Sequence, residues 1–503
     1  PMDLIVKVMD EHSNVIYSQQ KFSLLKDSVF ELKFIIKNPK VWNPLGSGES
    51  NVYHVKISVS TVKGEKFEFH KQVGFRTVSL VQTPDSIGSS FYFKVNGQPV
   101  FAKGANWTPM EFLPHQNTPE KYRKLLNMVH DAGYNMLRVW GGGWYEDDVF
   151  YDICDSLGIM VWQDAMFACT MYPFDKDYLN NVSNEIQFQS QRLSSHPSLV
   201  LWCGNNENYE GWFNWGWQKQ FGYSATDSVV IWNGNRQLFE TVIPQALKET
   251  YGDIGFNYHP SSPANGWGRD TAYKSGDVHY WGVWWGMEPF SNYTKKVGRF
   301  VSEYGFQGYP DIKTLRYGAN QPIDSLSQPS VAAHQKHFRG FQTIEEYMQR
   351  DYPKPTNVAD YIYLSQLMQA DGVGEAIKAH RVNVPYCMGS LFWQFSDCWS
   401  SVSWSAVDYF ARPKQFYFAS KRLFEPVRPI FVQKENSTEI WVSNIDKKSF
   451  NGSLSLMEVS QNGTLRVIQN SQVSISPNSS SMINILMESH KKPNSILLAL
   501  LLD

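Results

Sequence analysis

Two glutamates each follow a short apolar run. Residues 199–203 are apolar and lead through a glycine and two asparagines to Glu207, and residues 300–301 lead through Ser302 to Glu303. A short apolar run that ends at a turn signal is typical of a strand buried on both faces. In a barrel of parallel strands, side chains just past the carboxyl ends of the strands gather over one mouth. We therefore expect the two carboxyl groups to face each other, although they lie far apart in the chain.

A pair of facing carboxyl groups suits the hydrolysis of a glycosidic bond. One carboxylic acid protonates the departing oxygen, and the other attacks or stabilises the cationic carbon; at a separation of about 5–5.5 Å the second group is a nucleophile and configuration is retained. The acid needs a raised pKa and the nucleophile must stay ionised, so we expect the cation of Arg138, which ends another apolar run, to support Glu303. The alternative is that each glutamate is a polar loop residue, but their matching strand contexts argue against it.

Other polar side chains at the ends of predicted strands are candidates for holding a substrate. Asn206 offers an amide that could bind a sugar hydroxyl next to the reacting carbon, and such a bond can strengthen in the transition state. Asp164 would either bind a sugar hydroxyl or form an ion pair with Arg138. Both interpretations of Asp164 remain open at this point.

Aromatic residues make up 15% of the chain, with 18 tryptophans, and several lie at the same strand ends. This fits a ligand with flat apolar faces and many hydroxyls, which is a sugar. His279, Tyr280 and Trp281 close the sixth predicted strand and would line the pocket or belong to the core or rim. Trp215 follows Glu207 and would be a platform for the leaving-group sugar or would pack its own loop.

The charges nearly cancel, with 46 basic and 48 acidic residues. A nucleic acid or an anionic membrane would call for a basic face, so neither is expected as a partner. The five cysteines are odd in number and include no Cys-x-x-Cys pair, which indicates neither a disulfide framework nor a metal site. No metal or cofactor is expected.

The pattern along the chain predicts a multidomain protein. Short alternating stretches separated by turn formers predict an immunoglobulin-like β-sandwich over residues 1–82. Strands then alternate with helices over residues 83–424, which predicts a central (β/α)₈ barrel, and β-structure returns as a second sandwich over residues 425–503. The poorly patterned stretch 321–356 would be a lid or a surface elaboration.

The eight predicted barrel strands are residues 100–104, 136–140, 159–162, 199–207, 255–259, 277–281, 299–302 and 390–394. Between the first two, Thr118 and Pro119 predict the N-cap and first turn of a helix.

Several segments together resemble a β-mannosidase of glycoside hydrolase family 2. They are Asn135–Gly143, Asp152–Asp155, Val161–Asp164, Gly204–Asn208 and Ser302–Gly305. The match extends over residues 70–425, and the combination of motifs is highly specific. Gly74, Phe75 and Arg76 at the entry to this region, and the β-domains on both sides, also agree with that family.

The resemblance implies roles for individual residues. Glu207 would be the acid/base and Glu303 the nucleophile of a retaining, exo-acting β-mannosidase that removes terminal β-linked mannose from oligosaccharides or glycoconjugates. Trp140 and Trp393 would line the pocket for the terminal mannose, and Asn206 would contact its 2-hydroxyl. The implied partner is a β-mannoside oligosaccharide, with no cofactor, and export from the cytoplasm is favoured by the resemblance alone.

Two alternatives to this interpretation differ from it in the sugar that is removed or in the class of protein. One is another family 2 exo-glycosidase, of the β-glucosaminidase or β-galactosidase type, and the other is a non-catalytic sugar-binding barrel. Family members begin with a further β-sandwich that places acidic residues at the rim of the pocket. We expect the chain to be a fragment without that domain and without a final β-domain, and we expect the N-terminal domain to be needed to complete the pocket.

Overall fold

The computed structural model describes residues 2–10, 12, 14–24, 33, 35–61, 63–487 and 496–502. Within these ranges, none of the helices combines the length and apolar character that crossing a membrane would require.

A sheet of eight parallel strands forms the centre of the protein, in the order β12-β11-β10-β9-β8-β15-β14-β13. This is the order of consecutive strands around a (β/α)₈ barrel, so the predicted fold class is confirmed. All eight predicted strands are present, although the fifth and sixth are only two residues long. Their bounds are β8 (Ala102–Trp107), β9 (Met136–Val139), β10 (Met160–Asp164), β11 (Leu199–Cys203), β12 (Tyr258–His259), β13 (Val278–His279), β14 (Val301–Glu303) and β15 (Gly389–Phe392).

Burial on both faces explains the continuous apolar runs of these strands. In β11, Leu201 and Cys203 belong to the cluster inside the barrel, whereas Trp202 between them packs outward among the helices. Because side chains alternate along a strand, the same rule turns Arg138 of β9 inward, since its neighbour Leu137 packs outward. A cation is thereby forced into the barrel interior.

The ladder of the sheet ends at β12 and β13, and side chains join these two strands instead. His259 of β12 contacts Asp277, which precedes β13, with 2.9 Å between Nε2 and Oδ1. Ser262 donates to the other oxygen of Asp277 at 2.6 Å, and the backbone N–H of Ala264 donates to the first at 3.0 Å. This seam of the barrel is thus closed by a buried carboxylate rather than by backbone pairing.

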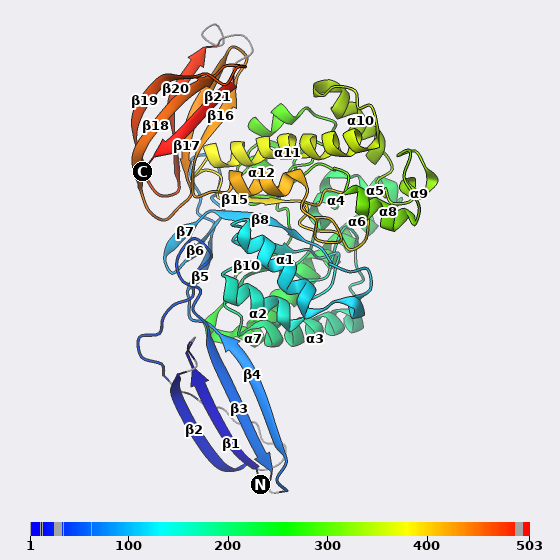
Figure 1. Ribbon diagram of the computed structural model, residues 1–503. Helices are drawn as coiled ribbons and strands as arrows, with labels where there is room; N and C mark the ends of the chain where they lie inside the picture. The colour runs from blue at the N-terminus through cyan, green and yellow to red at the C-terminus, as the bar shows by residue number, and fades with distance from the viewer. Residues whose placement is uncertain are drawn as a thin grey trace.

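Helices cover the barrel from outside (Figure 1). The helix α1 begins as predicted, because the Thr118 side chain accepts a hydrogen bond from the backbone of Lys121 and Pro119 is its first residue. The stretch 321–356 contains α9 and α10. The helices are α1 (Pro119–Asp131), α2 (Asp148–Leu157), α3 (Lys176–Leu193), α4 (Asn208–Asn214), α5 (Trp217–Gln220), α6 (Ala225–Arg236), α7 (Ile243–Tyr251), α8 (Ile312–Ala319), α9 (Pro329–Ala332), α10 (Gly340–Asp351), α11 (Val358–Val382) and α12 (Gln415–Leu423).

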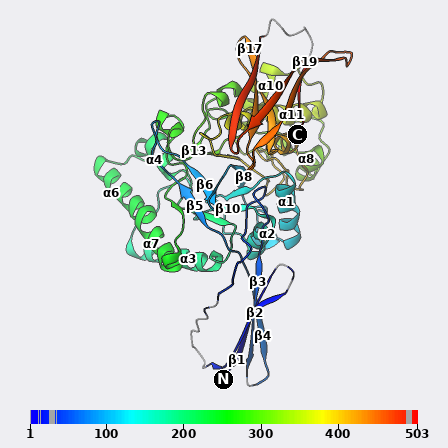
Figure 2. The ribbon, with the colours of Figure 1, turned by 90° about the vertical axis from the view of Figure 1, so that its left-hand side faces the viewer.

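Antiparallel sheets flank the barrel at both ends of the chain. The N-terminal one, in the order β2-β1-β3-β4, projects away from the barrel in Figures 1 and 2. The C-terminal pair, β16-β17-β20 and β19-β18-β21, encloses its own apolar core, as a sandwich does. The strands are β1 (Met2–Met9), β2 (Val15–Leu24), β3 (Tyr53–Thr61), β4 (Lys66–Val73), β16 (Val427–Gln433), β17 (Ser437–Asn444), β18 (Phe450–Val459), β19 (Leu465–Ile475), β20 (Ser479–Met487) and β21 (Ile496–Leu502).

A small sheet links the N-terminal region to the barrel. It consists of β5 (Val78–Val81), β6 (Tyr92–Val95) and β7 (Gln98–Val100), in that order. The predicted boundary between residues 82 and 83 falls between β5 and β6, which are paired strands. The three domain ranges remain predictions.

Candidate active site

Glu207 and Glu303 converge at the carboxyl ends of their strands. Glu303 is the last residue of β14, and Glu207 is the N-cap of α4, with a left-handed backbone conformation (φ 62°) that is rare for a residue with a side chain. One carboxylate oxygen of each lies within 4.8 Å of the other. The backbone of Glu207 is held by a 2.8 Å hydrogen bond from its N–H to the carbonyl of Ser262. The predicted encounter of the two carboxyl groups is therefore present in the structure.

The guanidinium of Arg138 organises the floor of this site. It is fully buried and donates to Glu303 Oε1 at 2.6 Å and to Asp164 Oδ2 at 2.8 Å. It also donates to the side-chain oxygens of Asn106 at 2.9 Å and Asn206 at 2.7 Å. Asp164 accordingly forms the ion pair that was one of its two predicted roles. The oxygen of Asn206 is committed to Arg138, so its NH₂ group is the part that is left to face a substrate.

The two glutamates have different electrostatic surroundings. Burial raises the pKa of Glu207 to about 7, an effect that Arg138 opposes only from a distance. Burial also raises the pKa of Glu303, but the directly bonded Arg138 stabilises its charged form. The indole N–H of Trp281 donates to Glu303 as well, at 3.3 Å. Glu207 is therefore the group that retains a proton near neutral pH, while Glu303 has a cation and a donor in direct contact.

His279 stands between the two carboxyl groups. Its Nδ1 lies 2.9 Å from Glu207 Oε1 and 3.4 Å from Glu303 Oε2. The imidazole is fully buried, and burial lowers its pKa to about 4 despite the charge of Glu303. His279 is therefore a neutral ring at physiological pH, in contact with both groups of the pair.

A cavity of about 620 Å³ opens over the pair, and most of its wall is aromatic. Its lining residues are Trp140, Cys169, Asn206, Glu207, Glu210, Trp215, Trp267, Trp281, Trp285, Glu303, Trp393 and Trp404. Indole faces suit the apolar faces of a sugar ring, and a few polar groups among them would fix its orientation.

Most of the predicted site residues gather at this cavity. Seven of them line it. Arg138 and His279 are buried and bonded to lining residues, and the buried Asp164 is bonded to Arg138. Tyr280 is the exception. Its hydroxyl donates to Glu288 and its ring packs against Trp267 and Tyr293, so the structure does not bring it to the cavity.

Five lining residues were not among the predicted ones. Glu210 lies three positions after Glu207, one turn further along α4, where burial raises its pKa to about 7. This i+3 spacing was a usable signal. Cys169, Trp267, Trp285 and Trp404 come from loops whose path the sequence pattern does not reveal. The Sγ of Cys169 lies 3.5 Å from Glu207 Oε2.

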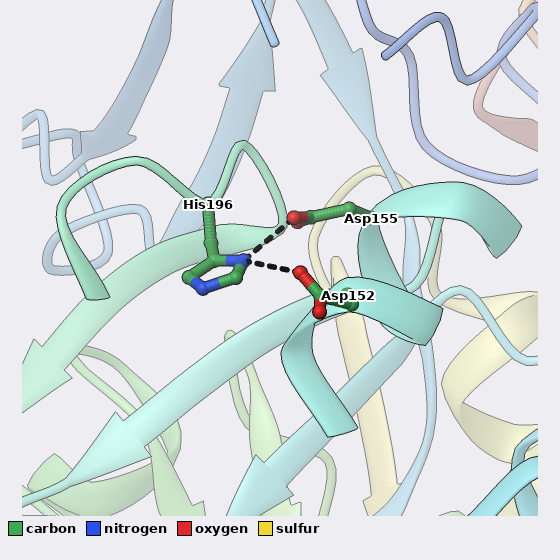
Figure 3. Close-up of side chains that lie close together, drawn as sticks. All are labelled: Asp152, Asp155 and His196. Carbon is green, nitrogen blue, oxygen red and sulfur yellow. Dashed lines mark hydrogen bonds and ion pairs between the residues drawn. The ribbon is translucent and has the colours of Figure 1, made fainter. Parts of the chain in front are cut away.

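A second cluster of acidic and histidine side chains lies at the opposite end of the barrel, before β11 begins. Figure 3 shows Nδ1 of His196 facing Asp155 and Asp152 of α2, at 2.7 Å and 4.0 Å. The other oxygen of Asp155 accepts the backbone N–H of Ser198 at 3.0 Å. The two hydrogen bonds of Asp155 thus tie α2 to the loop before β11, and features of this barrel face serve stability rather than catalysis.

Comparisons with known proteins relate this chain to one family of enzymes. Residues 4–76 match the family described as "Glycosyl hydrolases family 2". Beta-mannosidase B of Aspergillus clavatus is 34% identical over 489 residues, which cover 92% of this chain and 57% of the relative. Beta-mannosidase B of Aspergillus niger is 36% identical over 404 residues, or 79% of this chain and 48% of the relative. The chain spans about half the length of these curated relatives.

Solved structures give the same picture. The beta-D-mannosidase of Dictyoglomus thermophilum superposes with a TM-score of 0.88 at 35% identity, over 99% of this chain and 60% of that one. The exo-chitosanase of Amycolatopsis orientalis superposes with a TM-score of 0.68 at 17% identity, over 100% of this chain and 60% of that one. The second likeness is one of fold.

Because the pKa of Glu207 is raised on folding, its ionisation should lower the stability of the fold as the pH rises. A carboxyl group whose pKa is raised on folding stabilises the fold fully below its unfolded value, and this contribution is lost as the pH rises through its folded value, here about 7. Glu207→Gln should therefore become more stable relative to the parent between pH 4.5 and 8, by on the order of 3 kcal/mol. Thermal midpoints across this range measure the difference. The exposed Glu345→Gln is the control, and a parallel course of the Glu207→Gln and parent curves would contradict the assignment.

Removing the buried cation should destabilise the barrel. Arg138→Gln leaves Asp164 and Glu303 buried without their partner, and breaking such a pair costs about 3–5 kcal/mol. Arg339→Gln is a matched control, because the 2.9 Å pair of Arg339 with Glu346 is exposed, and its loss should cost less than about 1 kcal/mol. Thermal denaturation at pH 7 compares the two. Equal losses would mean that Arg138 does not hold the two carboxylates as described.

Proposed function

The chain belongs to family 2 of the glycosyl hydrolases, and we propose that it carries the active site of a retaining exo-β-mannosidase. One observation supports this above the others: two buried carboxyl groups, one without a cation in direct contact and with a raised pKa, the other paired with a cation, face each other below a tryptophan-lined cavity. The named relatives support mannose as the sugar.

The proposed reaction depends on the different surroundings of the two glutamates. Glu303 attacks the anomeric carbon while Glu207 gives its proton to the departing oxygen, which produces a covalent glycosyl-enzyme. Glu207 then removes a proton from a water molecule that releases the sugar with its original configuration. An oxygen-to-oxygen approach within 4.8 Å supports this route, because an inverting reaction needs about 6.5–9.5 Å between the groups to admit a water.

Asn206 is the proposed contact for the 2-hydroxyl of the sugar. Its oxygen accepts from Arg138 at 2.7 Å, which directs its NH₂ group toward the cavity, where Nδ2 lies 3.4 Å from both Glu207 and Cys169. This hydroxyl is axial in mannose and equatorial in glucose, so a donor fixed in direction can distinguish the two sugars.

A further domain is proposed to complete the rim of the cavity, as the family resemblance implies. Trp215 and Trp285 of the lining are 42% and 52% exposed, so part of the aromatic wall is open to solvent in the region that the structure describes. A domain covering this wall would confine the substrate to a single terminal sugar.

Replacing each glutamate should affect substrates differently. Glu303→Ala removes the nucleophile and should lower kcat for aryl β-mannosides by orders of magnitude, whatever the leaving group. Glu207→Ala should spare substrates with good leaving groups, which need little protonation, and should slow those with poor ones far more. Steady-state rates over a series of leaving groups measure this. A Glu303→Ala variant that keeps most of its activity would contradict the assignment.

A panel of aryl glycosides should show preference for β-mannoside. The panel is run on this chain and on a version extended by an N-terminal β-sandwich of the family type. Higher activity of the extended version would support the proposed role of the further domain. Preference for β-glucosaminide or β-galactoside would point to another exo-glycosidase of the family. Binding without hydrolysis of any glycoside, seen by isothermal titration with both versions, would point to a sugar-binding barrel.

A further inference from the structure

The proton of the buried His279 is fixed by groups that do not touch the cavity. Its Nδ1 faces the two catalytic carboxyl groups, whereas its Nε2 lies 3.0 Å from the hydroxyl oxygen of Ser262 and 3.5 Å from Nη1 of Arg138. A neutral imidazole has one donor nitrogen and one acceptor nitrogen, and its neighbours decide which is which.

Arg138 cannot supply a proton to Nε2. Its Nη1 carries two hydrogens, and these are used on Glu303 Oε1 at 2.6 Å and on Asn106 Oδ1 at 2.9 Å. The 3.5 Å contact with His279 is therefore a close approach without a donor. It also places a positive charge beside Nε2, which on its own would favour a lone pair at that nitrogen, so the bond to Ser262 must decide where the proton lies.

The hydroxyl proton of Ser262 is likewise committed elsewhere. Ser262 Oγ lies 2.6 Å from Asp277 Oδ2, and a hydroxyl can approach a carboxylate this closely only if it donates to it. Asp277 is ionised, because its contact with His259 and the hydrogen bond from Ser262 outweigh its burial and lower its pKa. Ser262 can therefore only accept from His279, so the proton of the imidazole lies on Nε2.

We propose that Ser262 and Asp277 are positioning residues that hold His279 as its Nε2–H tautomer, so that its bare Nδ1 accepts the acid proton of Glu207. This inference rests on the proposed function, because it explains how the acid is kept protonated before a substrate arrives. When Glu207 loses its proton to the leaving group, its oxygen faces a lone pair at 2.9 Å, which favours the return of a proton from water.

Other charged groups around the ring set the background for this arrangement. Glu303, Arg138, Asp277 and Asp164 all act on His279. Glu207 is in addition influenced by Arg138, Cys169 and Asn206, and Glu210 lies in the same cavity. None of these groups touches Ser262 Oγ in the described residues except Asp277, so a change at Ser262 alters the tautomer without replacing a charge.

Ser262→Ala tests whether Ser262 holds the Nε2–H tautomer of His279. Without an acceptor at Nε2, the ring should move its proton to Nδ1 and donate to Glu207, which stabilises the ionised acid. The alkaline pKa of kcat/KM, measured with an aryl β-mannoside that has a poor leaving group, should fall by about one unit, a tenfold change in proton affinity. Ser262→Thr keeps the hydroxyl and should keep the parent profile.

Ser302→Ala is the matched control. Ser302 donates to the same oxygen of Asp277 at the same distance of 2.6 Å, yet it makes no hydrogen bond to His279. Its loss should cost similar stability and leave the alkaline pKa in place. Equal shifts of the alkaline pKa in Ser262→Ala and Ser302→Ala, or no shift in either variant, would overturn the proposed role of Ser262.

A spectroscopic readout separates this inference from the proposed function. In ¹⁵N-histidine-labelled protein near pH 7, the ring of His279, identified by its loss in His279→Gln, should give the pattern of an Nε2–H tautomer. An Nδ1–H or doubly protonated ring would overturn the inference. Absence of hydrolysis by the parent chain would count against the proposed function, while the ring spectrum would still decide the tautomer.

Discussion

One buried guanidinium determines how charge is distributed in this site. Arg138 contacts Glu303 and Asp164 directly and holds the amide oxygens of Asn106 and Asn206. Two carboxylates already outnumber this one positive charge, so the ionisation of a third buried carboxyl group nearby is unfavourable. Glu207 is that third group. In the proposed reaction, the difference between the proton donor and the nucleophile arises from a single positive charge that is bonded to one glutamate and not to the other.

A second constraint on the site lies between β12 and β13, where the two end strands of the parallel sheet meet. Backbone pairing is missing between β12 and β13, and Asp277 joins the two strands through four donors: the side chains of His259, Ser262 and Ser302 and the backbone N–H of Ala264. Through Ser262, the same carboxylate is proposed to fix the tautomer of His279, the ring that contacts both glutamates. Closure of the fold and the protonation of the site therefore depend on one buried side chain.

Features set by local pattern were predictable from the sequence. Apolar runs buried on both faces indicated the eight strands and their order, and the residues at the ends of those runs indicated both glutamates and Arg138. The role of Asp277 was not predictable in this way. It opens the sixth predicted strand and looked like an ordinary strand residue, since only closure of the barrel brings its partners on β12 and β14 to it. Tyr280 alternates away from the site, which the predicted strand end did not reveal.

The tryptophans of the outer wall were beyond sequence reasoning for a different reason. Trp267, Trp285 and Trp404 belong to long connections without periodicity, whose path is set by packing against each other and against neighbouring loops.

The central claim is that Glu303 forms the bond to the sugar. A 2-deoxy-2-fluoro-β-mannosyl fluoride slows both steps but reacts through a good leaving group, so the covalent intermediate accumulates, and peptide mapping by mass spectrometry locates the attached sugar. We predict a single fluoromannosyl group on the peptide that contains Glu303, at that residue. Attachment to Glu207 or to any other residue would contradict the claim.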